Sequence, residues 1–282
     1  MVTQQEKGQR FRALHERDRA FILPNPWDVG TARMLAQMGF EALATTSAGY
    51  AFSHGVLDGE VGRDAMLAHI TNIVEATELP VSADLENGFG DSPEFVAETI
   101  GLAAAQGLVG GSIEDSTGDK NNPIYPIELA KERIQAAVQA ARSLSYPFTL
   151  TARAENFLHD RPDFYDTILR LQAYQEAGAD VLYAPGLTSR EDIAMVVQAL
   201  DRPVNVLCGM PGMRLNLAEL SNIGVKRIST GSALARSAFA GFLVSAREMA
   251  DDGTFGFVDS AAVNSREVVP LLQAWRKAAG TA

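Results

Sequence analysis

The stretch VSADLENGFGDSPEFVAETIGLAAAQGLVGGSIED, residues 81–115, contains one complete strand–helix–strand unit. A short apolar run at residues 81–85 is followed by Ser92-Pro-Glu, where the serine can cap free helix amides and the acid offsets the helix dipole. The helical pattern ends at Gly107, a residue type that tolerates the positive φ common just past a helix. A second apolar run follows at residues 111–114. The unit therefore predicts two parallel strands joined by a helix.

The same pattern recurs along the whole chain. Gly39, Gly178 and Gly224 each end another helical pattern just before an apolar strand. Eight strands are predicted, at residues 21–24, 42–46, 81–85, 111–114, 148–153, 181–184, 204–207 and 227–230. Together with the helical stretches between them, they predict an α/β fold of the (β/α)8 TIM-barrel type. Residues 1–250 are expected to form this catalytic barrel domain.

Residues 251–282 lie beyond the eighth unit and contain a loop and a last helix, SREVVPLLQAWRKAAG, at residues 265–280. One face of this helix carries Val268, Leu271, Leu272 and Trp275. Because the ring of barrel helices has no obvious place for it, we expect the helix to pack on a neighbouring subunit. The alternative is that it caps its own barrel.

Composition excludes several classes of protein. The 282 residues carry a formal net charge of -11, which disfavours binding to nucleic acid or anionic membranes. No apolar run is long enough to cross a membrane, and the first residues do not resemble a secretory signal. The single cysteine, Cys208, excludes an intramolecular disulfide and is expected to be a buried small hydrophobe. These features predict a cytoplasmic protein, and they leave a small anionic substrate possible.

Carboxylates dominate the ends of the middle strands, where barrel enzymes form their active sites. Asp84 and Glu86 follow the third predicted strand, and Glu114 ends the fourth. Crowded carboxylates repel one another unless they are protonated or bridged by a hard cation. We therefore predict a Mg²⁺ site, with Mn²⁺ as the alternative ion, in which Asp84 is the direct ligand. The competing interpretation is a set of salt bridges to Arg153 or Lys120.

The segment Thr45-Thr-Ser-Ala-Gly-Tyr50 follows the second predicted strand and is small and rich in hydroxyl groups. The Ser47 hydroxyl and the successive amides after it predict an anion-binding nest for a substrate carboxylate. A plain turn carrying a helix cap is the alternative interpretation. Asn205, in the seventh predicted strand, is a further candidate for substrate binding.

Six motifs occur in a characteristic order along the chain. They are PNPWDVGTAR (24–33), TTSAGYA (45–51), DGE (58–60), SADLENGFG (82–90), SIED (112–115) and TARAENF (151–157). In this order they resemble the isocitrate lyase and phosphoenolpyruvate mutase superfamily. The resemblance implies an α/β barrel, a Mg²⁺ ion, a 2-oxo acid ligand and a homotetramer that exchanges a C-terminal helix, with a dimer as the alternative.

The resemblance also implies roles for individual side chains. Ser47 with the Gly49 and Tyr50 amides would hold the substrate carboxylate, and Trp27 would wall the pocket. The remaining roles concern the charged residues. Asp84 would bind Mg²⁺, Glu86 and Glu114 would support it through water, Asp58 would face its water shell, and Arg153 would contact substrate oxygens.

A divalent ion chelated by a 2-oxo acid stabilises the enolate left when a bond at C3 breaks. Lyases acting on isocitrate or methylisocitrate resemble one another in a Lys-Lys-Cys-Gly-His loop whose cysteine is the acid, and this chain has no such loop. The corresponding stretch is Ser116–Tyr125, where Lys120 and Asn122 resemble the loop pair of the mutase and of phosphonopyruvate hydrolase. His54 is a further candidate for donating a proton, and the predicted catalytic residues are Arg153, Asp58, Lys120 and Asn122.

The leading prediction is thus a Mg²⁺-dependent carbon–carbon lyase of the oxaloacetate decarboxylase type, acting on a small 2-oxo or substituted dicarboxylic acid. One alternative is a phosphonopyruvate hydrolase or phosphoenolpyruvate mutase. The other is a 2-oxo acid binding protein without catalytic activity, because the cysteine acid is missing.

Overall fold

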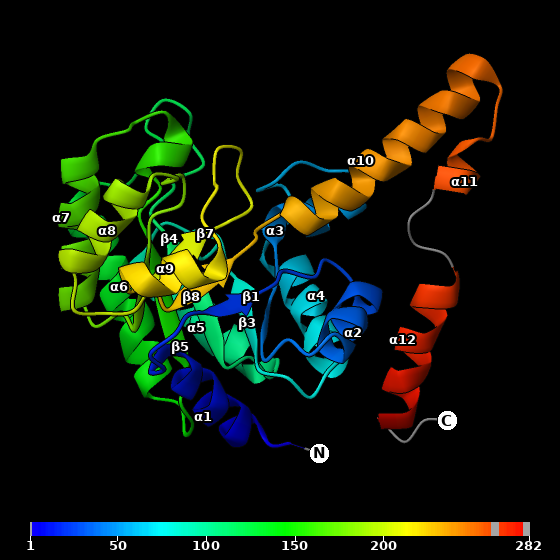
Figure 1. Ribbon diagram of the computed structural model, residues 1–282. Coiled ribbons are helices and arrows are strands. Elements are labelled where there is room, and N and C mark those ends of the chain that lie inside the picture. The colour runs from blue at the N-terminus through cyan, green and yellow to red at the C-terminus, as the bar shows by residue number, and fades with distance from the viewer. Residues whose placement is uncertain (1, 261–264, 279–282) are drawn as a thin grey trace.

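The computed structural model describes residues 2–260 and 265–278 and contains an eight-stranded parallel sheet in the order β1-β8-β7-β6-β5-β4-β3-β2 (Figure 1). The strands are β1 (Phe21–Leu23), β2 (Leu43–Ala44), β3 (Val81–Asp84), β4 (Gly110–Glu114), β5 (Thr149–Arg153), β6 (Val181–Tyr183), β7 (Val204–Leu207) and β8 (Arg227–Ser229). The two end strands meet where the Ala44 N–H donates to the Pro24 carbonyl at 3.1 Å. The predicted (β/α)8 barrel is therefore confirmed.

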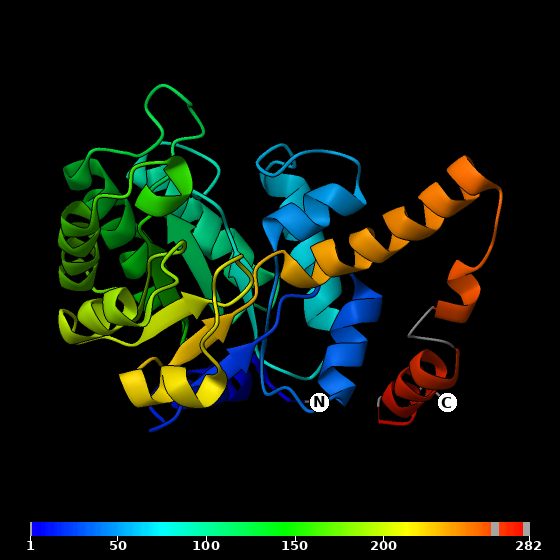
Figure 2. The same ribbon diagram turned by 45° about the horizontal axis from the view of Figure 1, so that its top comes forward.

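Helices surround the sheet, as Figures 1 and 2 show. They are α1 (Gln4–His15), α2 (Val29–Gln37), α3 (Ser47–Ser53), α4 (Arg63–Glu75), α5 (Pro93–Ala105), α6 (Ile127–Arg142), α7 (Phe164–Glu176), α8 (Arg190–Gln198), α9 (Leu217–Ile223), α10 (Ala233–Arg247), α11 (Phe257–Ser260) and α12 (Ser265–Ala278), with a 3-10 turn (Asn156–His159) and a π-helical turn (Glu248–Asp252). Ser92 and Ser189 cap α5 and α8 through their side chains. Gly224 ends α9 with a φ of 104°. The sequence signals for helix starts and stops therefore operate as expected.

Helix α1 packs against the amino-terminal ends of the strands. The Phe11 ring approaches Gly110 so closely that a Cβ there would lie 2.7 Å from a ring carbon. His15, at the end of α1, meets the Phe21 ring edge-on with centroids 5.0 Å apart, and its Nδ1 lies 2.8 Å from the Phe11 carbonyl oxygen. Both aromatic side chains and the imidazole are buried. This packing closes the end of the barrel opposite the predicted site.

The burial of His15 predicts a loss of stability in acid. Burial, with the nearby charge of Arg227, lowers the pKa of His15 to about 3. The unfolded chain would take up this proton near pH 6.5, so below that pH it binds more protons than the folded state and the unfolding free energy falls. For this one group we expect about 2 kcal/mol less stability at pH 5 than at pH 7.

Urea unfolding of wild type and His15→Leu at the two pH values checks this expectation. The variant should lose less stability on acidification, while His69, whose pKa is lowered to about 4 mainly by burial, still contributes its own loss. Equal acid losses in the two proteins would contradict the assignment.

The C-terminal segment leaves the body of the barrel. Helix α10 extends away from the sheet in both ribbon views (Figures 1 and 2), and Ala235 is its buried residue. Phe242 and Val244 are 66% and 65% exposed. Helix α12 packs on α2 of the same chain, since the Arg33 guanidinium stacks 3.6 Å above the Trp275 ring. Its exchange between subunits stays a prediction, and residues 261–264 and 279–282 of the predicted C-terminal unit lie outside the described residues.

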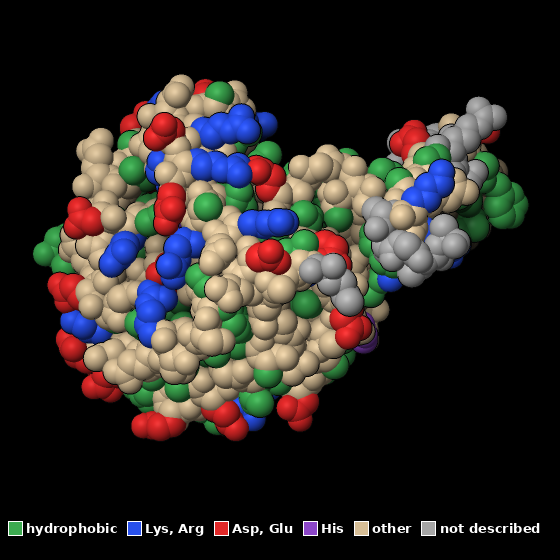
Figure 3. Space-filling view, turned by 90° about the horizontal axis from the view of Figure 1, so that it is seen from below, with side chains coloured by type: hydrophobic (Ala, Val, Ile, Leu, Met, Phe, Trp, Pro, Cys, Tyr) green, Lys and Arg blue, Asp and Glu red, His purple; other side chains and the backbone are tan. Residues whose placement is uncertain are grey.

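The face of the molecule that is seen from below (Figure 3) carries charges of both signs. On the face shown in Figure 3, Lys and Arg side chains are interspersed with Asp and Glu. Within the two described ranges, no helix combines the length and the hydropathy needed to span a membrane.

Candidate active site at the carboxyl ends of the strands

An open cavity of about 880 Å³ lies within the barrel, and every strand of the sheet contributes to its lining. Its walls combine strand residues with the loops that follow β2, β3, β4 and β5. In barrels of this type the loops at the carboxyl ends of the strands build the active site. Most of the predicted charged site residues line this cavity, namely Asp58, Asp84, Glu86, Glu114 and Arg153, together with Ser47 and Asn205.

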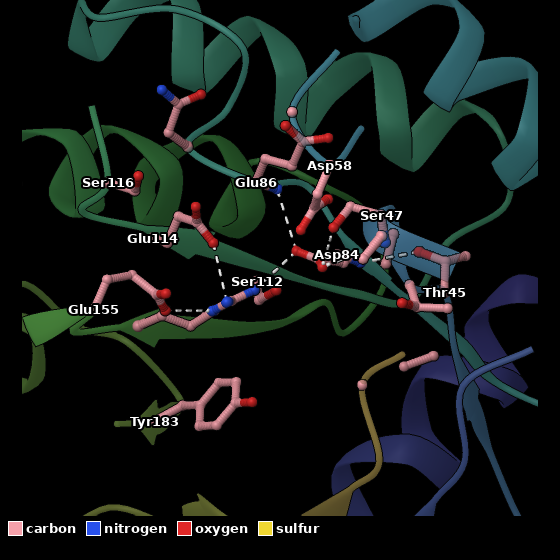
Figure 4. A pocket seen from close by; sticks show the side chains of 18 of the residues that line it. Thr45, Ser47, Asp58, Asp84, Glu86, Ser112, Glu114, Ser116, Glu155 and Tyr183 are labelled. Atoms are coloured by element: carbon pink, nitrogen blue, oxygen red, sulfur yellow. Dashed lines mark hydrogen bonds and ion pairs between the residues drawn. The ribbon is translucent and has the colours of Figure 1, made fainter. Parts of the chain in front are cut away.

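Arg153 ends β5 and pairs with three carboxylates, Asp84, Glu114 and Glu155, which Figure 4 labels in the cavity. It forms three ion pairs: Nη1 with Asp84 at 2.9 Å, Nη2 with Glu114 at 3.1 Å and Nε with Glu155 at 2.9 Å. Strand register explains part of this, because Glu114 and Arg153 are direct neighbours on β4 and β5. Although burial disfavours the charge, the surrounding carboxylates hold the pKa of Arg153 above its ordinary value. The guanidinium is therefore positively charged, and the carboxylates that pair with its three nitrogens fix its orientation.

Asp84 ends β3 and is oriented from two sides. Its Oδ2 accepts a hydrogen bond from the Ser47 hydroxyl at 2.9 Å, and its Oδ1 faces Arg153. Its backbone N–H donates to the Thr45 hydroxyl at 3.0 Å, which ties the end of β3 to the end of β2. Asp84 therefore points toward the cluster, as the predicted metal site requires.

Glu86 follows in a strained conformation, with a φ of 49° in the left-handed region. Its Oε1 is buried and has no hydrogen-bond partner. Burial and the neighbouring charges of Asp84 and Asp58 raise the pKa of Glu86 to about 8. The pKa of Asp58, on the loop after α3, is also raised, because the surrounding protein displaces water and Asp84 lies near. Figure 4 shows Asp58, Asp84 and Glu86 on one side of the cavity. Asp84 is paired with Arg153, whereas among the described residues neither Asp58 nor Glu86 forms an ion pair.

These residues fit a hard divalent cation, although the site is not preassembled. Within residues 2–260 and 265–278, no three His, Cys, Asp or Glu side chains come close enough to form a complete metal site. Mg²⁺ keeps several of its waters and needs only one or two direct carboxylates, so a complete protein cage is not required. Asp84 as the direct ligand, with Glu86 and Glu114 reached through water, meets that requirement. The partnerless Glu86 oxygen is the observation that supports it.

The predicted anion nest has a different local structure. Residues 47–53 form helix α3, and Thr46 caps it: the Gly49 N–H donates to the Thr46 hydroxyl at 3.2 Å and the Tyr50 N–H to its carbonyl at 3.1 Å. Trp27 packs behind Gly49, where a Cβ would lie 3.2 Å from the Trp27 Cβ. Among the described residues that line the cavity, neither Trp27, Gly49 nor Tyr50 is found. Their contact with substrate stays a prediction.

The loop from Ser116 to Tyr125 forms a short antiparallel excursion at the mouth of the cavity, closed by a bridge between Ser116 and Ile124. Its residues 116–118 line the cavity. Lys120 and Asn122 are exposed at its tip, and the Asn122 side chain donates to Asp119 at 3.4 Å. Neither reaches the cavity in this conformation, so their catalytic role also stays a prediction.

Asp115 supports the cluster from behind, a role that the sequence did not assign. It is buried, and its Oδ1 accepts the Glu155 backbone N–H at 2.8 Å. Its Oδ2 accepts from the Tyr174 hydroxyl at 2.6 Å and from Arg170 at 3.1 Å. Asp115 thereby holds the residue that pairs with Arg153. Its position directly after a strand was the available signal, but sequence alone does not show which side of the strand end it faces.

Tyr183, at the end of β6, also lines the cavity without having been assigned a role. Its ring centre lies 5.2 Å from the Arg153 guanidinium carbon. His54, a candidate proton donor, is exposed and lies beside the Tyr50 carbonyl at 3.1 Å. It does not line the cavity within the described chain.

The family model for phosphoenolpyruvate phosphomutase matches residues 11–250, which covers the entire barrel. The chain belongs to this family. The resemblance of the six motifs to the isocitrate lyase and phosphoenolpyruvate mutase superfamily is therefore confirmed.

Several members of the wider group are similar to this chain. A solved structure from Burkholderia cenocepacia J2315, provisionally described as a lyase/mutase, is 60% identical over 95% of this chain and 96% of that one, with a TM-score of 0.92. The structure of 2,3-dimethylmalate lyase is 28% identical and covers 100% of both chains, with a TM-score of 0.83. Oxaloacetate decarboxylase from Pseudomonas putida (strain GB-1) is 27% identical over 79% of this chain and 78% of its own length. Two of these relatives are thus named as a lyase and a decarboxylase.

Proposed function

We propose that this protein is a Mg²⁺-dependent carbon–carbon lyase that acts on a small 2-oxo or substituted dicarboxylic acid, with decarboxylation of an oxaloacetate-type substrate as its leading reaction. The observation that carries the proposal is the placement of Asp84 between the Ser47 hydroxyl and the Arg153 guanidinium, in a cavity where, among the described residues, the buried Oε1 of Glu86 has no hydrogen-bond partner. The names of the oxaloacetate decarboxylase and dimethylmalate lyase relatives support the same class of substrate.

The metal would be held by oxygen donors of β3 and β4. Asp84 would be the direct ligand, Glu86 and Glu114 would act through water, and Asp58 would face the same waters from its loop. Mn²⁺ would be accepted by the same ligands, since both ions prefer carboxylate and water oxygens. When bound, the ion would supply a Lewis acid that polarises the 2-oxo group of the substrate.

Arg153 supplies the fixed positive charge for the reaction. Its three ion pairs use three of the five N–H donors of a guanidinium, which leaves two for substrate oxygens. In decarboxylation the C3–C4 bond breaks, its electron pair passes into the enolate, CO₂ leaves, and C3 later takes up a proton. Preorganised donors aimed at the developing oxyanion lower this barrier without reorienting during the reaction. Glu114 and Glu155 keep the guanidinium in that orientation.

A Mg²⁺-dependent turnover screen of oxaloacetate, methylisocitrate, 2,3-dimethylmalate and phosphonopyruvate tests the proposal. We expect turnover of oxaloacetate or dimethylmalate that chelation abolishes and added Mg²⁺ restores. Cleavage of phosphonopyruvate instead would establish the phosphonate alternative, which the mouth loop bearing Lys120 and Asn122 keeps open. Tight oxalate binding without turnover of any substrate would establish a binding protein.

We further propose that the segment from α10 onward packs on a neighbouring copy in a homotetramer, or in a dimer. The exposed Phe242 and Val244 support this, because large apolar side chains grouped on a projecting helix usually mark an interface. Exchange of α12 would replace the stacking of Trp275 on Arg33 by the same contact with the neighbour. Light scattering after size exclusion should show an oligomer, and a monomer at micromolar concentration would exclude it.

A further inference from the structure

Arg227 is a second guanidinium of the same cavity. It is the first residue of β8, is 4% exposed and lines the cavity from the wall formed by β7 and β8. Its Nε donates to the side-chain oxygen of Asn205 at 2.9 Å. Asn205 therefore holds the guanidinium in place through a neutral group and gives it no counter-charge.

Among the residues that the structure describes, no carboxylate pairs with this guanidinium. In the described part of the chain, none of the ion pairs involves Arg227, and its buried Nη1 has no hydrogen-bond partner. Burial lowers the pKa of Arg227 to about 10, so the group is still charged at neutral pH. A buried charge without a partner costs several kcal/mol, whereas Arg153 in the same cavity has three carboxylates. The folded protein thus keeps an unbalanced cation beside an open space.

The two arginines are connected along one wall. Strand register places Arg153, Tyr183, Asn205 and Arg227 side by side on β5, β6, β7 and β8. The Asn205 amide also donates to the Ser229 hydroxyl at 2.9 Å, and all five of these side chains line the cavity. Polar groups therefore extend continuously from the acid cluster to the unbalanced guanidinium.

We propose that Arg227, held by Asn205, binds a second carboxylate of the substrate, so that the site selects 2-oxo dicarboxylic acids over 2-oxo monocarboxylic acids. The inference rests on the proposed function, in which the 2-oxo acid head lies near Asp84 and Arg153. It assigns Asn205 a positioning role in place of the direct contact with substrate that the sequence suggested. The charge-assisted pairing of a carboxylate with a planar guanidinium supplies the selectivity.

Calorimetry on the Mg²⁺-loaded protein tests this with matched ligands. 2-Oxoglutarate and 2-oxovalerate differ in a terminal carboxylate against a methyl group, and 2-oxoadipate and 2-oxohexanoate form the equivalent six-carbon pair, measured by competition against oxalate. In at least one pair, wild type should bind the dicarboxylate roughly tenfold or more tightly. Arg227→Met should remove that preference, while the affinity for oxalate, which represents the head group alone, changes by less than about threefold.

Two further variants make the result specific. Arg227→Lys keeps a charge without the planar fork and should retain part of the preference, and it replaces Arg227→Met if that variant does not fold. Arg17→Met removes an exposed arginine and should leave both affinities unchanged. The inference would be overturned by a wild type without preference in either pair, or by Arg227→Met, or Arg227→Lys in its place, with the full preference of wild type. Oxalate that fails to bind wild type with Mg²⁺ would overturn the proposed function, and the inference with it.

Discussion

Replacing Asp84 by asparagine should lower the Mg²⁺-dependent kcat/KM by on the order of 10³-fold. The amide keeps the size of the side chain and can accept the hydrogen bond from Ser47, but it then turns an NH₂ group toward Arg153 and carries no negative charge for a divalent ion. Even supporting residues around a metal typically contribute tenfold to a hundredfold, and the direct ligand should contribute more. Initial rates over a Mg²⁺ titration measure the effect. The half-saturating Mg²⁺ concentration should rise together with the loss in rate.

Two further variants accompany Asp84→Asn: one is a control, and the other tests how Asp84 is oriented. Asp64→Asn removes an exposed carboxylate of α4 and should leave the rate and the Mg²⁺ dependence unchanged. Ser47→Ala removes the 2.9 Å hydrogen bond that orients Asp84 and should cost about tenfold to a hundredfold. Activity of Asp84→Asn within tenfold of wild type at every Mg²⁺ concentration would show that the ion is held elsewhere.

The barrel could be predicted because its signals are local and repeated. Each strand is a short apolar run that follows a glycine or a turn, and the prediction of eight strands matches the sheet to within a few residues at each end. Helix α1 could not be predicted in this way, because its buried positions include Lys7, Gly8 and His15, residue types that do not form an apolar stripe. Its packing depends on a close approach between Gly8 and the Pro147 carbonyl, which is a tertiary property.

The charged part of the site could be predicted, because its residues directly end or follow predicted strands. Asp84, Glu86, Glu114 and Arg153 were identified because carboxylates and a guanidinium at neighbouring strand ends must interact. The anion nest at Gly49 and Tyr50 was less predictable, because the same hydroxyl-rich segment also caps helix α3. Anion binding and helix capping use the same backbone amides, and a sequence does not show which of the two the fold adopts.

Arg227 shows a different limit of sequence reasoning. An arginine at the start of a strand is usually exposed, so its type and position give no sign that it faces the cavity. Its burial follows from strand register, which places it beside Asn205 in the barrel wall. Such a residue becomes visible only when its missing counter-charge can be counted in three dimensions.

Arg153→Met should lower kcat by about 10² to 10³-fold and should also change how Mg²⁺ affects stability. In wild type, Arg153 forms ion pairs with Asp84, Glu114 and Glu155, and its removal leaves these carboxylates without their shared cationic partner. Breaking such a buried network costs roughly 3–5 kcal/mol of unfolding free energy. A divalent cation at Asp84 would restore part of the missing positive charge. Added Mg²⁺ should therefore raise the melting temperature of the variant more than that of wild type.

Arg153→Lys tests the positive charge of residue 153 separately from the planar geometry of the guanidinium. A lysine ammonium supplies one positive charge but cannot span three carboxylates with a planar fork, so stability should recover more fully than kcat. Thermal melts with and without Mg²⁺, together with kcat measured at saturating substrate, give both quantities for each variant. If Mg²⁺ stabilised wild type and Arg153→Met equally, the ion and the guanidinium would not share these carboxylates, and the metal site would have to lie apart from Asp84.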